Sequence, residues 1–402
     1  MIRPLILLLP ATLILASAAA QLEIVTEFNP SETGSVCGLG GAQDVWAYQC
    51  FGSEIDHYAS DGSFLGSLPR PGGSANDVDL DVLSVPMMLA GVSIPAGTLL
   101  FFDGESGACE VYATDPITGT VLASLVTAFG MSHVVGGCYA PATGTLFLLQ
   151  DRVVGGGNAN LVAEIDPSTG AILSTFSTIA SGVNVNFGDI DASLVTGNLY
   201  IVSSAEDSIF EFTPAGVLVA AYDLPMGVGG LAGLATDDVS GGAWVASSSG
   251  TIWFLSGLVQ IGTPYCSPAV QNSSGAPCLI RAFGSEVRSL NGVRLTAFQL
   301  PSNSFGYFIT SRTQGLVMGP GGSQGTLCLG GSVGRYNLPA QIFNSTGVGR
   351  ASVDIDLGST PTPAMGFISV MAGETWNYQA WYRDANPTAT SNFSDGVFVT
   401  YQ

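Results

Sequence analysis

Alternating acidic residues are the clearest candidates for chemistry in this sequence. Asp77, Asp79 and Asp81 alternate along one short stretch, and Asp189 and Asp191 repeat the spacing further along the chain. Side chains two residues apart share one face of an extended strand, so each group would present its carboxylates together. Hard cations such as Ca²⁺ prefer clusters of oxygen ligands. The spacing is not that of an EF-hand, so a solvated acidic strand face is the alternative to a calcium site, and no cofactor is certain.

The two histidines are the candidates for a base near neutral pH. His133 precedes a predicted inner strand and could face a channel, which makes it a candidate ligand-binding residue. A hydrogen-bonded histidine at a strand end is the alternative. His57 is expected on the surface of a hairpin.

A second candidate ligand-binding residue belongs to an aromatic group in the last part of the chain. This group consists of Trp376, Tyr378, Trp381 and Tyr382. Trp381 shares a strand face with Asn377 and Gln379, whereas the other three aromatic residues share the opposite face. An exposed aromatic ring beside amides could stack on a sugar, and a core position is the alternative.

A serine motif in the same part of the chain does not predict a hydrolase. Gly321–Gly325 matches the GxSxG pattern, but a nucleophilic serine needs a histidine base nearby. No histidine occurs after His133. The motif is therefore interpreted as a glycine-rich loop.

Seven cysteines in a chain with an export signal predict disulfides, with one cysteine left over. Cys37 and Cys50 would lie near opposite ends of a hairpin and could face each other. Cys109 and Cys138 fall on neighbouring repeats. Spacing alone does not fix the pairing, and the disulfide candidates are Cys37, Cys50, Cys109, Cys138, Cys266 and Cys328.

A repeated hairpin is the element that must position these residues. In Ala163–Phe176 a strand leads into the turn Asp166-Pro167-Ser168-Thr169, and Gly170 can take the left-handed conformation that closes a bulged hairpin. The same pattern returns around three more glycines, Gly62, Gly119 and Gly216. Each unit also contains an upstream strand and a shorter run of small residues that suits an innermost strand.

A fifth unit follows in Trp244–Ser247 and Thr251–Leu255, and five units predict a five-bladed β-propeller, since blades have four strands and repeat every ~40–50 residues. The fifth unit lacks an outer strand. Leu22–Phe28 alternates like a strand and has no repeat of its own. We therefore expect this N-terminal strand to close the ring as the missing outer strand.

The two ends of the chain differ in composition. Residues 1–20 have the layout of a secretory signal peptide, with an uncleaved N-terminal anchor as the alternative, and no later apolar run reaches the ~20 residues of a transmembrane segment. Residues 21–262 contain 25 acidic residues and two arginines, a net charge of −23, whereas residues 263–402 contain 6 acidic residues and 7 arginines. Such an acidic half repels nucleic acid and anionic membrane surfaces and attracts cations.

The repeats stop at Ile261-Gly262-Thr263-Pro264, where we place a boundary between a propeller of residues 21–262 and an antiparallel β-sandwich of residues 263–402. Turn signals separate less regular strands in the second part, among them Thr375–Arg383 and Gly396–Tyr401. The whole chain is expected to be all-β.

Several motifs in the second part resemble a C-terminal domain appended to many exported bacterial proteins. They are Tyr265-Cys266, Leu327-Cys328-Leu329-Gly330-Gly331, the segment Gly373–Asp384 and the segment Ser391–Gly396. The resemblance implies export and an accessory module without an assigned reaction. It also implies a Cys266–Cys328 pairing that leaves Cys278 as the odd thiol. The first half resembles NHL and lactonase-like propellers in its blade pattern, and lactonase-like propellers bind a divalent ion in the channel through acidic and amide ligands.

These observations predict a non-enzymatic binding or scaffold protein, secreted from or held on the surface of a bacterium. Its partner would be an extracellular protein or a carbohydrate, and the sandwich would serve as an accessory or attachment module. The alternative is a divalent-metal-dependent hydrolase or lactonase whose site lies in the channel around Asp77, Asp79, Asp189 and His133.

Overall fold

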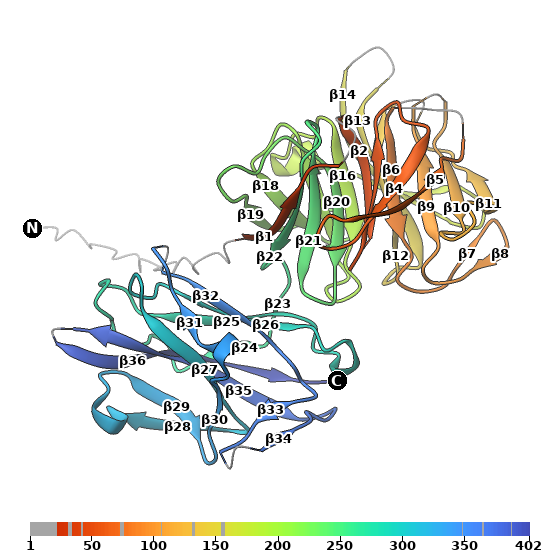
Figure 1. Ribbon diagram of the computed structural model, residues 1–402. Helices are drawn as coiled ribbons and strands as arrows, with labels where there is room; N and C mark the ends of the chain where they lie inside the picture. The colour runs from red at the N-terminus through yellow and green to blue at the C-terminus, as the bar shows by residue number, and fades with distance from the viewer. Residues whose placement is uncertain are drawn as a thin grey trace, which may run out of the picture.

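The computed structural model describes residues 22–30, 34–41, 43–72, 76–105, 107–130, 133–153, 157–347, 349–363, 366–386 and 388–402. The predicted signal peptide lies outside these residues. Strands dominate, and they fall into two groups along the chain, β1–β22 and β23–β36 (Figure 1). In the described part of the chain, no helix is long and apolar enough to span a membrane.

The first group contains five antiparallel sheets of four strands each. Four of them follow chain order. The first contains β2 (Val36–Gly41), β3 (Val45–Gln49), β4 (Glu54–Tyr58) and β5 (Phe64–Pro69). The second contains β6 (Val78–Val82), β9 (Leu99–Asp103), β10 (Glu110–Thr114) and β11 (Val121–Val126), and between β6 and β9 the chain forms a small hairpin of β7 (Met87–Leu89) and β8 (Val92–Ile94).

The next two sheets repeat this order. The third contains β12 (Val134–Ala140), β13 (Thr145–Arg152), β14 (Asn158–Ile165) and β15 (Ile172–Ser177). A short 3-10 turn (Thr178–Ser181) leads into the fourth, which contains β16 (Gly188–Ala192), β17 (Leu199–Ser203), β18 (Ser208–Phe212) and β19 (Leu218–Asp223).

The fifth sheet joins both ends of this group. It contains β20 (Leu231–Asp237), β21 (Gly242–Ser247) and β22 (Ile252–Ser256), and its outer strand is β1 (Glu23–Phe28). β1 runs antiparallel to β22, with Glu23 opposite Ser256 and Phe28 opposite Ile252.

The first strands of the five sheets contact one another in a ring, β2 with β6, β6 with β12, β12 with β16, β16 with β20 and β20 with β2. This arrangement of sheets around an axis is that of a β-propeller. Small residues allow the close approach, because a Cβ added at Gly136 would lie 2.7 Å from the backbone nitrogen of Ile190.

The repeated hairpin has the predicted geometry. Gly170 has φ = 73°, and Gly62, Gly119 and Gly216 also have positive φ. Each of the four hairpins contains a register shift just before its turn, between Glu164 and Ile165 in the third sheet. The turns therefore form bulged hairpins because glycine occupies the left-handed position at no steric cost.

The second group forms two larger sheets packed face to face. One contains β23 (Gln260–Ile261), β25 (Leu279–Gly284), β26 (Val293–Phe298) and β32 (Ala351–Ile355). The other contains β24 (Thr263–Tyr265), β36 (Ala389–Thr400), β35 (Thr375–Ala385), β27 (Phe305–Ser311) and β30 (Gly334–Tyr336), with β31 (Phe343–Asn344) also paired to β27. Buried residues from both sheets, such as Ile280, Leu295, Tyr378 and Val397, form one hydrophobic core, so this part is sandwich-like.

Short elements complete the second group. Two hairpins are formed by β28 (Thr313–Met318) with β29 (Thr326–Gly330) and by β33 (Thr360–Pro361) with β34 (Phe367–Ile368). Three 3-10 turns cover Arg288–Leu290, Pro320–Gly322 and Pro339–Gln341.

Two disulfides are present, Cys37–Cys50 and Cys266–Cys328. Cys278 is a buried free thiol, as the resemblance of the C-terminal part implied. Cys109 and Cys138, which were also predicted as disulfide candidates, are buried free thiols instead. Their side chains pack in different hydrophobic clusters, Cys109 with Phe102 and Cys138 with Phe147. Adjacency of their repeats along the chain therefore did not bring the two sulfurs together.

Candidate functional site

Three strained residues mark one end of the propeller axis. Asp77, His133 and Phe187 have φ values of 37°, 58° and 45°, and each immediately precedes the inner strand of its sheet. Gly230, with φ = 64°, has the same place before β20. Left-handed backbone costs a non-glycine residue roughly 1–2 kcal/mol, and such strain concentrates at functional sites. We call this end of the axis the mouth.

A cavity of about 600 Å³ lies at the mouth and is lined by residues of four of the five sheets and by Asn76 and Asp77, which lead into the second sheet. Its apolar walls include Val36, Val135, Phe187, Ala232 and the Cys37–Cys50 disulfide, and Asn76, Asp77 and Ser248 add polar groups to them. This volume lies within the range of small-molecule sites, which combine apolar walls with a few polar groups.

One aspartate that lines the cavity is paired with a histidine. Nδ1 of His133 lies 2.8 Å from Oδ2 of Asp77, and the Asp77 side chain is 2% exposed whereas that of His133 is 31% exposed. The same carboxylate accepts a hydrogen bond from the side-chain amide of Asn76. Burial raises the pKa of Asp77 to about 6, while the neighbouring His133 acts in the opposite direction and Asp151 adds to the rise. A buried carboxylate that binds Nδ1 fixes the orientation of the imidazole ring.

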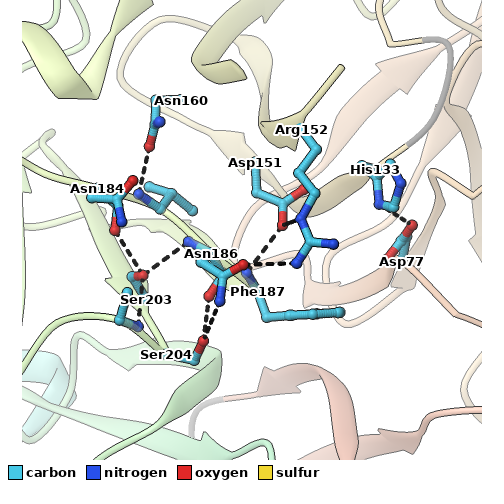
Figure 2. A network of polar contacts seen from close by, with 12 residues as sticks. Asp77, His133, Asp151, Arg152, Asn160, Asn184, Asn186, Phe187, Ser203 and Ser204 are labelled. Atoms are coloured by element: carbon cyan, nitrogen blue, oxygen red, sulfur yellow. Dashed lines mark hydrogen bonds and ion pairs between the residues drawn. The ribbon is translucent and has the colours of Figure 1, made fainter. Parts of the chain in front are cut away.

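An arginine is held rigidly beside this pair. Nη2 of Arg152 donates a hydrogen bond of 2.7 Å to Oδ1 of Asn186, its Nε lies 3.5 Å from Oδ2 of Asp151, and its guanidinium lies 5.0 Å from the centre of the Phe187 ring. Figure 2 shows the other terminal nitrogen of Arg152 pointing toward the side on which Asp77 and His133 lie. Arg152 is therefore preorganised as a cationic hydrogen-bond donor.

Asp151 occupies the centre of this network. Its Oδ2 accepts a hydrogen bond from the backbone N–H of Phe187, and its side chain is 1% exposed. Its Oδ1 has no hydrogen-bond partner among the described residues. Burial raises the pKa of Asp151, and Arg152 and His133 oppose that rise. We call Asp77, His133, Asp151 and Arg152 the mouth network.

Hydrogen bonds to loop amides fix the chain that leads into two of the inner strands. Glu105 accepts one from the backbone N–H of Asn76, and Glu206 accepts one from that of Asn184. The hydroxyl of Ser203 donates to the carbonyl of Asn184 and accepts from the N–H of Asn186 (Figure 2). The loop that holds Asn186 against Arg152 is thereby anchored to β17.

The axial aspartates predicted as metal ligands lie deeper in the channel and accept hydrogen bonds from neighbouring sheets. Asp79 accepts from the N–H groups of Leu39 and Gly137, at 3.4 and 2.7 Å. Asp189 accepts from Leu234 at 2.6 Å. The side chains of Asp79 and Asp189 also hydrogen-bond to each other, which requires a proton between the two carboxyl groups.

A second layer contains Asp81 and Asp191. Asp81 accepts a hydrogen bond of 2.8 Å from the N–H of Tyr139, and Asp191 accepts from both the N–H and the hydroxyl of Thr236. Burial raises the pKa of all four axial carboxyls, that of Asp79 to about 8 and that of Asp191 to about 6. Repulsion from Asp191 adds to the rise at Asp81.

This donor set does not resemble a calcium shell, which needs about six to eight oxygen ligands with ionised carboxylates. Within the described ranges, no three His, Cys, Asp or Glu side chains form a group that could hold a metal ion. Asp77, the fifth predicted ligand, is engaged by His133 instead. A calcium site at these five residues stays a prediction of the sequence.

The other candidate residues lie in hydrophobic or hydrogen-bonded surroundings. Trp381 is half-buried, with its ring centre 4.9 Å from that of Tyr307 and its side chain packed against a small core cluster that includes Leu329 and Phe393. Sugar stacking by Trp381 stays a prediction. His57 stacks on Trp46 at 4.0 Å, and burial lowers its pKa. The hydroxyl of Ser323 donates to the carbonyl of Ser391.

Two members of the mouth network, Asp151 and Arg152, and the cavity residue Phe187 were missed by the sequence reasoning. One signal was available, since Arg152 is one of only two arginines among residues 21–262, within a strongly acidic half. Its contact with Asn186 joins residues 34 positions apart, which no local pattern reveals.

Comparisons with known proteins give only distant likenesses. No family model and no curated protein matches the chain. Among solved structures, a streptogramin B lyase is 17% identical, with 70% of this chain and 86% of that chain covered and a TM-score of 0.34. Virginiamycin B lyase from Staphylococcus aureus is 14% identical, with 94% and 99% covered and a TM-score of 0.33. A protein of unknown function from Bacteroides thetaiotaomicron is 11% identical, with 58% and 75% covered and a TM-score of 0.35. The β-propeller assignment rests on the strand order and the ring of inner strands.

Proposed function

We propose that residues 21–262 are a five-bladed β-propeller closed by β1, and that its mouth binds a small, largely apolar molecule. The observation that carries this proposal is the cavity of about 600 Å³, whose walls come from four of the five sheets and from the residues that lead into the second sheet. Enclosed apolar surface with a few polar groups is the usual chemistry of a small-molecule site.

The charge of the propeller restricts the ligand. Residues 21–262 carry a net charge of −23, and Asp77 and Asp151 lie at the mouth. This field disfavours anionic ligands and favours uncharged or cationic ones. The guanidinium of Arg152 would donate hydrogen bonds to a polar group of the ligand at the mouth. The carboxylates of Asp77 and Asp151 would accept hydrogen bonds from such a group.

The remaining parts of the chain fit a role outside the cell. The predicted signal peptide of residues 1–20, the two disulfides and the sandwich of residues 263–402 support an exported bacterial protein with an accessory module. A metal-dependent hydrolase is the alternative for the propeller.

Binding is tested with Nile red, an uncharged apolar dye whose fluorescence rises in apolar surroundings. Ser248 lines the cavity and is exposed, whereas the neighbouring Ser249 is equally exposed but does not line it. We expect Ser248→Trp to weaken dye binding by about tenfold or more by filling the cavity, and Ser249→Trp to leave it unchanged. Saturable binding that responds equally to both substitutions, or no saturable binding by the wild-type protein, would contradict the proposal.

A further inference from the structure

We propose that the mouth network hydrolyses uncharged esters, with His133 as a general base that acts on water without a metal ion. This inference rests on the proposed small-molecule site and adds a reaction to it. The geometry that carries it is the buried Asp77 carboxylate 2.8 Å from Nδ1 of His133, beside a clamped arginine.

The imidazole is oriented for this role. Nδ1 of His133 faces the Asp77 carboxylate at 2.8 Å, and a carboxylate at that place favours the proton on Nδ1, which leaves the unshared electron pair of the neutral ring on Nε2. Nε2 has no hydrogen-bond or ion-pair contact with the described residues, and the His133 side chain is 31% exposed. The base therefore has one nitrogen held inside the protein and the other free to meet a water molecule. Asp77 and His133 both have left-handed backbone, which lowers the stability of the fold. Such strain is expected where it holds side chains in a functional geometry.

Arg152 supplies the second requirement of ester hydrolysis, a fixed donor for the developing oxyanion. One of its terminal nitrogens is occupied by Asn186 and its stem is held by Asp151 and the Phe187 ring. The other terminal nitrogen points toward the side of the His133–Asp77 pair (Figure 2). A donor that is already in place costs no reorganisation during the reaction.

The reaction balances without any further reagent. Nε2 of His133 removes a proton from water as the water oxygen bonds to the ester carbonyl carbon, and the carbonyl electron pair moves to oxygen beside Arg152. The tetrahedral intermediate then expels the alkoxide, which takes the proton back from the imidazolium. The products are a carboxylic acid and an alcohol, and His133 returns to its neutral form.

The cavity defines the substrate class. Asp77 lines the cavity next to the apolar wall of Val135 and Phe187, so a carbonyl near His133 would place an attached hydrocarbon chain inside the cavity. The acidic field of the propeller disfavours esters that carry a negative charge. We therefore expect uncharged esters of medium-chain apolar acids.

The test uses the full chain with p-nitrophenyl butyrate and p-nitrophenyl octanoate. His133→Asn is the main variant, because asparagine tolerates left-handed backbone and the fold is kept. We expect this variant to lower kcat by about 100-fold or more while Nile red binds as before. The matched control is His57→Asn, which alters the other histidine and is expected to leave kcat unchanged.

Two further measurements distinguish a loss of catalysis from a loss of folded structure. Asp77→Asn is expected to lower kcat with little change in KM, because an amide donor would reverse the tautomer of His133, so Asp77 is a positioning residue. An anionic ester, mono-p-nitrophenyl succinate, is expected to react about tenfold more slowly than the butyrate at low salt.

Wild-type hydrolysis that equals that of His133→Asn on both uncharged esters would overturn the inference. Nile red binding separates this failure from a failure of the proposed function. Bound dye without hydrolysis refutes only the reaction, whereas the absence of both refutes the site as well.

Discussion

The carboxyl groups of Asp79 and Asp189 share a hydrogen bond on the propeller axis, and through it they connect all five sheets. Asp79 belongs to the second sheet and accepts N–H groups from the first and third sheets, at Leu39 and Gly137. Asp189 belongs to the fourth sheet and accepts the N–H of Leu234 in the fifth. The axial aspartates thus serve as acceptors for backbone amides of the innermost strands of neighbouring sheets.

Stability should fall as pH rises. A carboxyl whose pKa is higher in the folded than in the unfolded state binds more protons when folded, so its contribution is present below about pH 4 and is lost as pH rises through the folded pKa. The folded values of about 8 for Asp79 and about 6 for Asp191 place the loss between about pH 4 and 8. We expect melting temperatures to fall from about pH 5 to about pH 9, as differential scanning calorimetry would show.

The carboxyls with lowered pKa act in the opposite direction but only in the acid range, below about pH 4.5; they are Asp61, Asp115, Asp166 and Glu374. Asp79→Asn, which does not titrate, should flatten the profile and so serves as its control. A melting temperature that rises over this range would contradict the shared proton.

Removal of the axial acceptor should be costly. Asp79→Ala leaves the buried N–H groups of Leu39 and Gly137 without acceptors, and each unsatisfied buried group costs about 1–3 kcal/mol. Asp79→Asn keeps an oxygen acceptor and should lose clearly less. Urea unfolding of the two variants measures the difference, and equal losses would show that the hydrogen bonds do not stabilise the axis.

Deletion of residues 21–30 should destabilise the propeller. β1 supplies the outer strand of the fifth sheet, and the buried Leu22 packs in the cluster of Leu231 and Leu255. We expect the melting temperature to fall by about 10 °C or more. Glu23→Gln serves as the control, because it removes the 3.3 Å contact with Arg350 but keeps the strand. An unchanged melting temperature after the deletion would exclude ring closure by β1.

Thiol titration should count three free cysteines. Cys109, Cys138 and Cys278 are buried thiols, and burial raises the pKa of each. We expect Ellman's reagent to label none of them rapidly in the folded protein and all three after denaturation without reductant, because protonated, buried thiols are unreactive. A single reactive thiol after denaturation would indicate a third disulfide.

Local patterns predicted the features that depend on local physics. The positive φ of Gly170 and the bulge before its turn follow from a proline turn followed by glycine, as the sequence indicated. Alternation placed Asp79 and Asp81 on the strand β6, but it could not reveal that their partners would be backbone amides of other sheets.

Features that depend on long-range contacts could not be predicted. The strand β36 begins at Ala389, seven residues before the predicted start at Gly396, and its early part contains polar residues that usually mark loops. Asn392 and Asp395 are nevertheless buried, because partners elsewhere in the fold satisfy their polar groups. Asn392 bonds to Asp384, and Asp395 pairs with Arg281 at 3.1 Å. The mouth network and its partners Asn186 and Phe187 assembled in the same way, from chain segments in or next to the second, third and fourth sheets.

A crystal structure of His133→Asn soaked with p-nitrophenyl butyrate would test the central claim most directly, because this variant should bind the ester without cleaving it. The account predicts intact ester in the mouth cavity, with its acyl chain against Val135 and Phe187 and its carbonyl oxygen beside Arg152. An empty cavity at saturating ester, or ester bound only elsewhere on the protein, would contradict it.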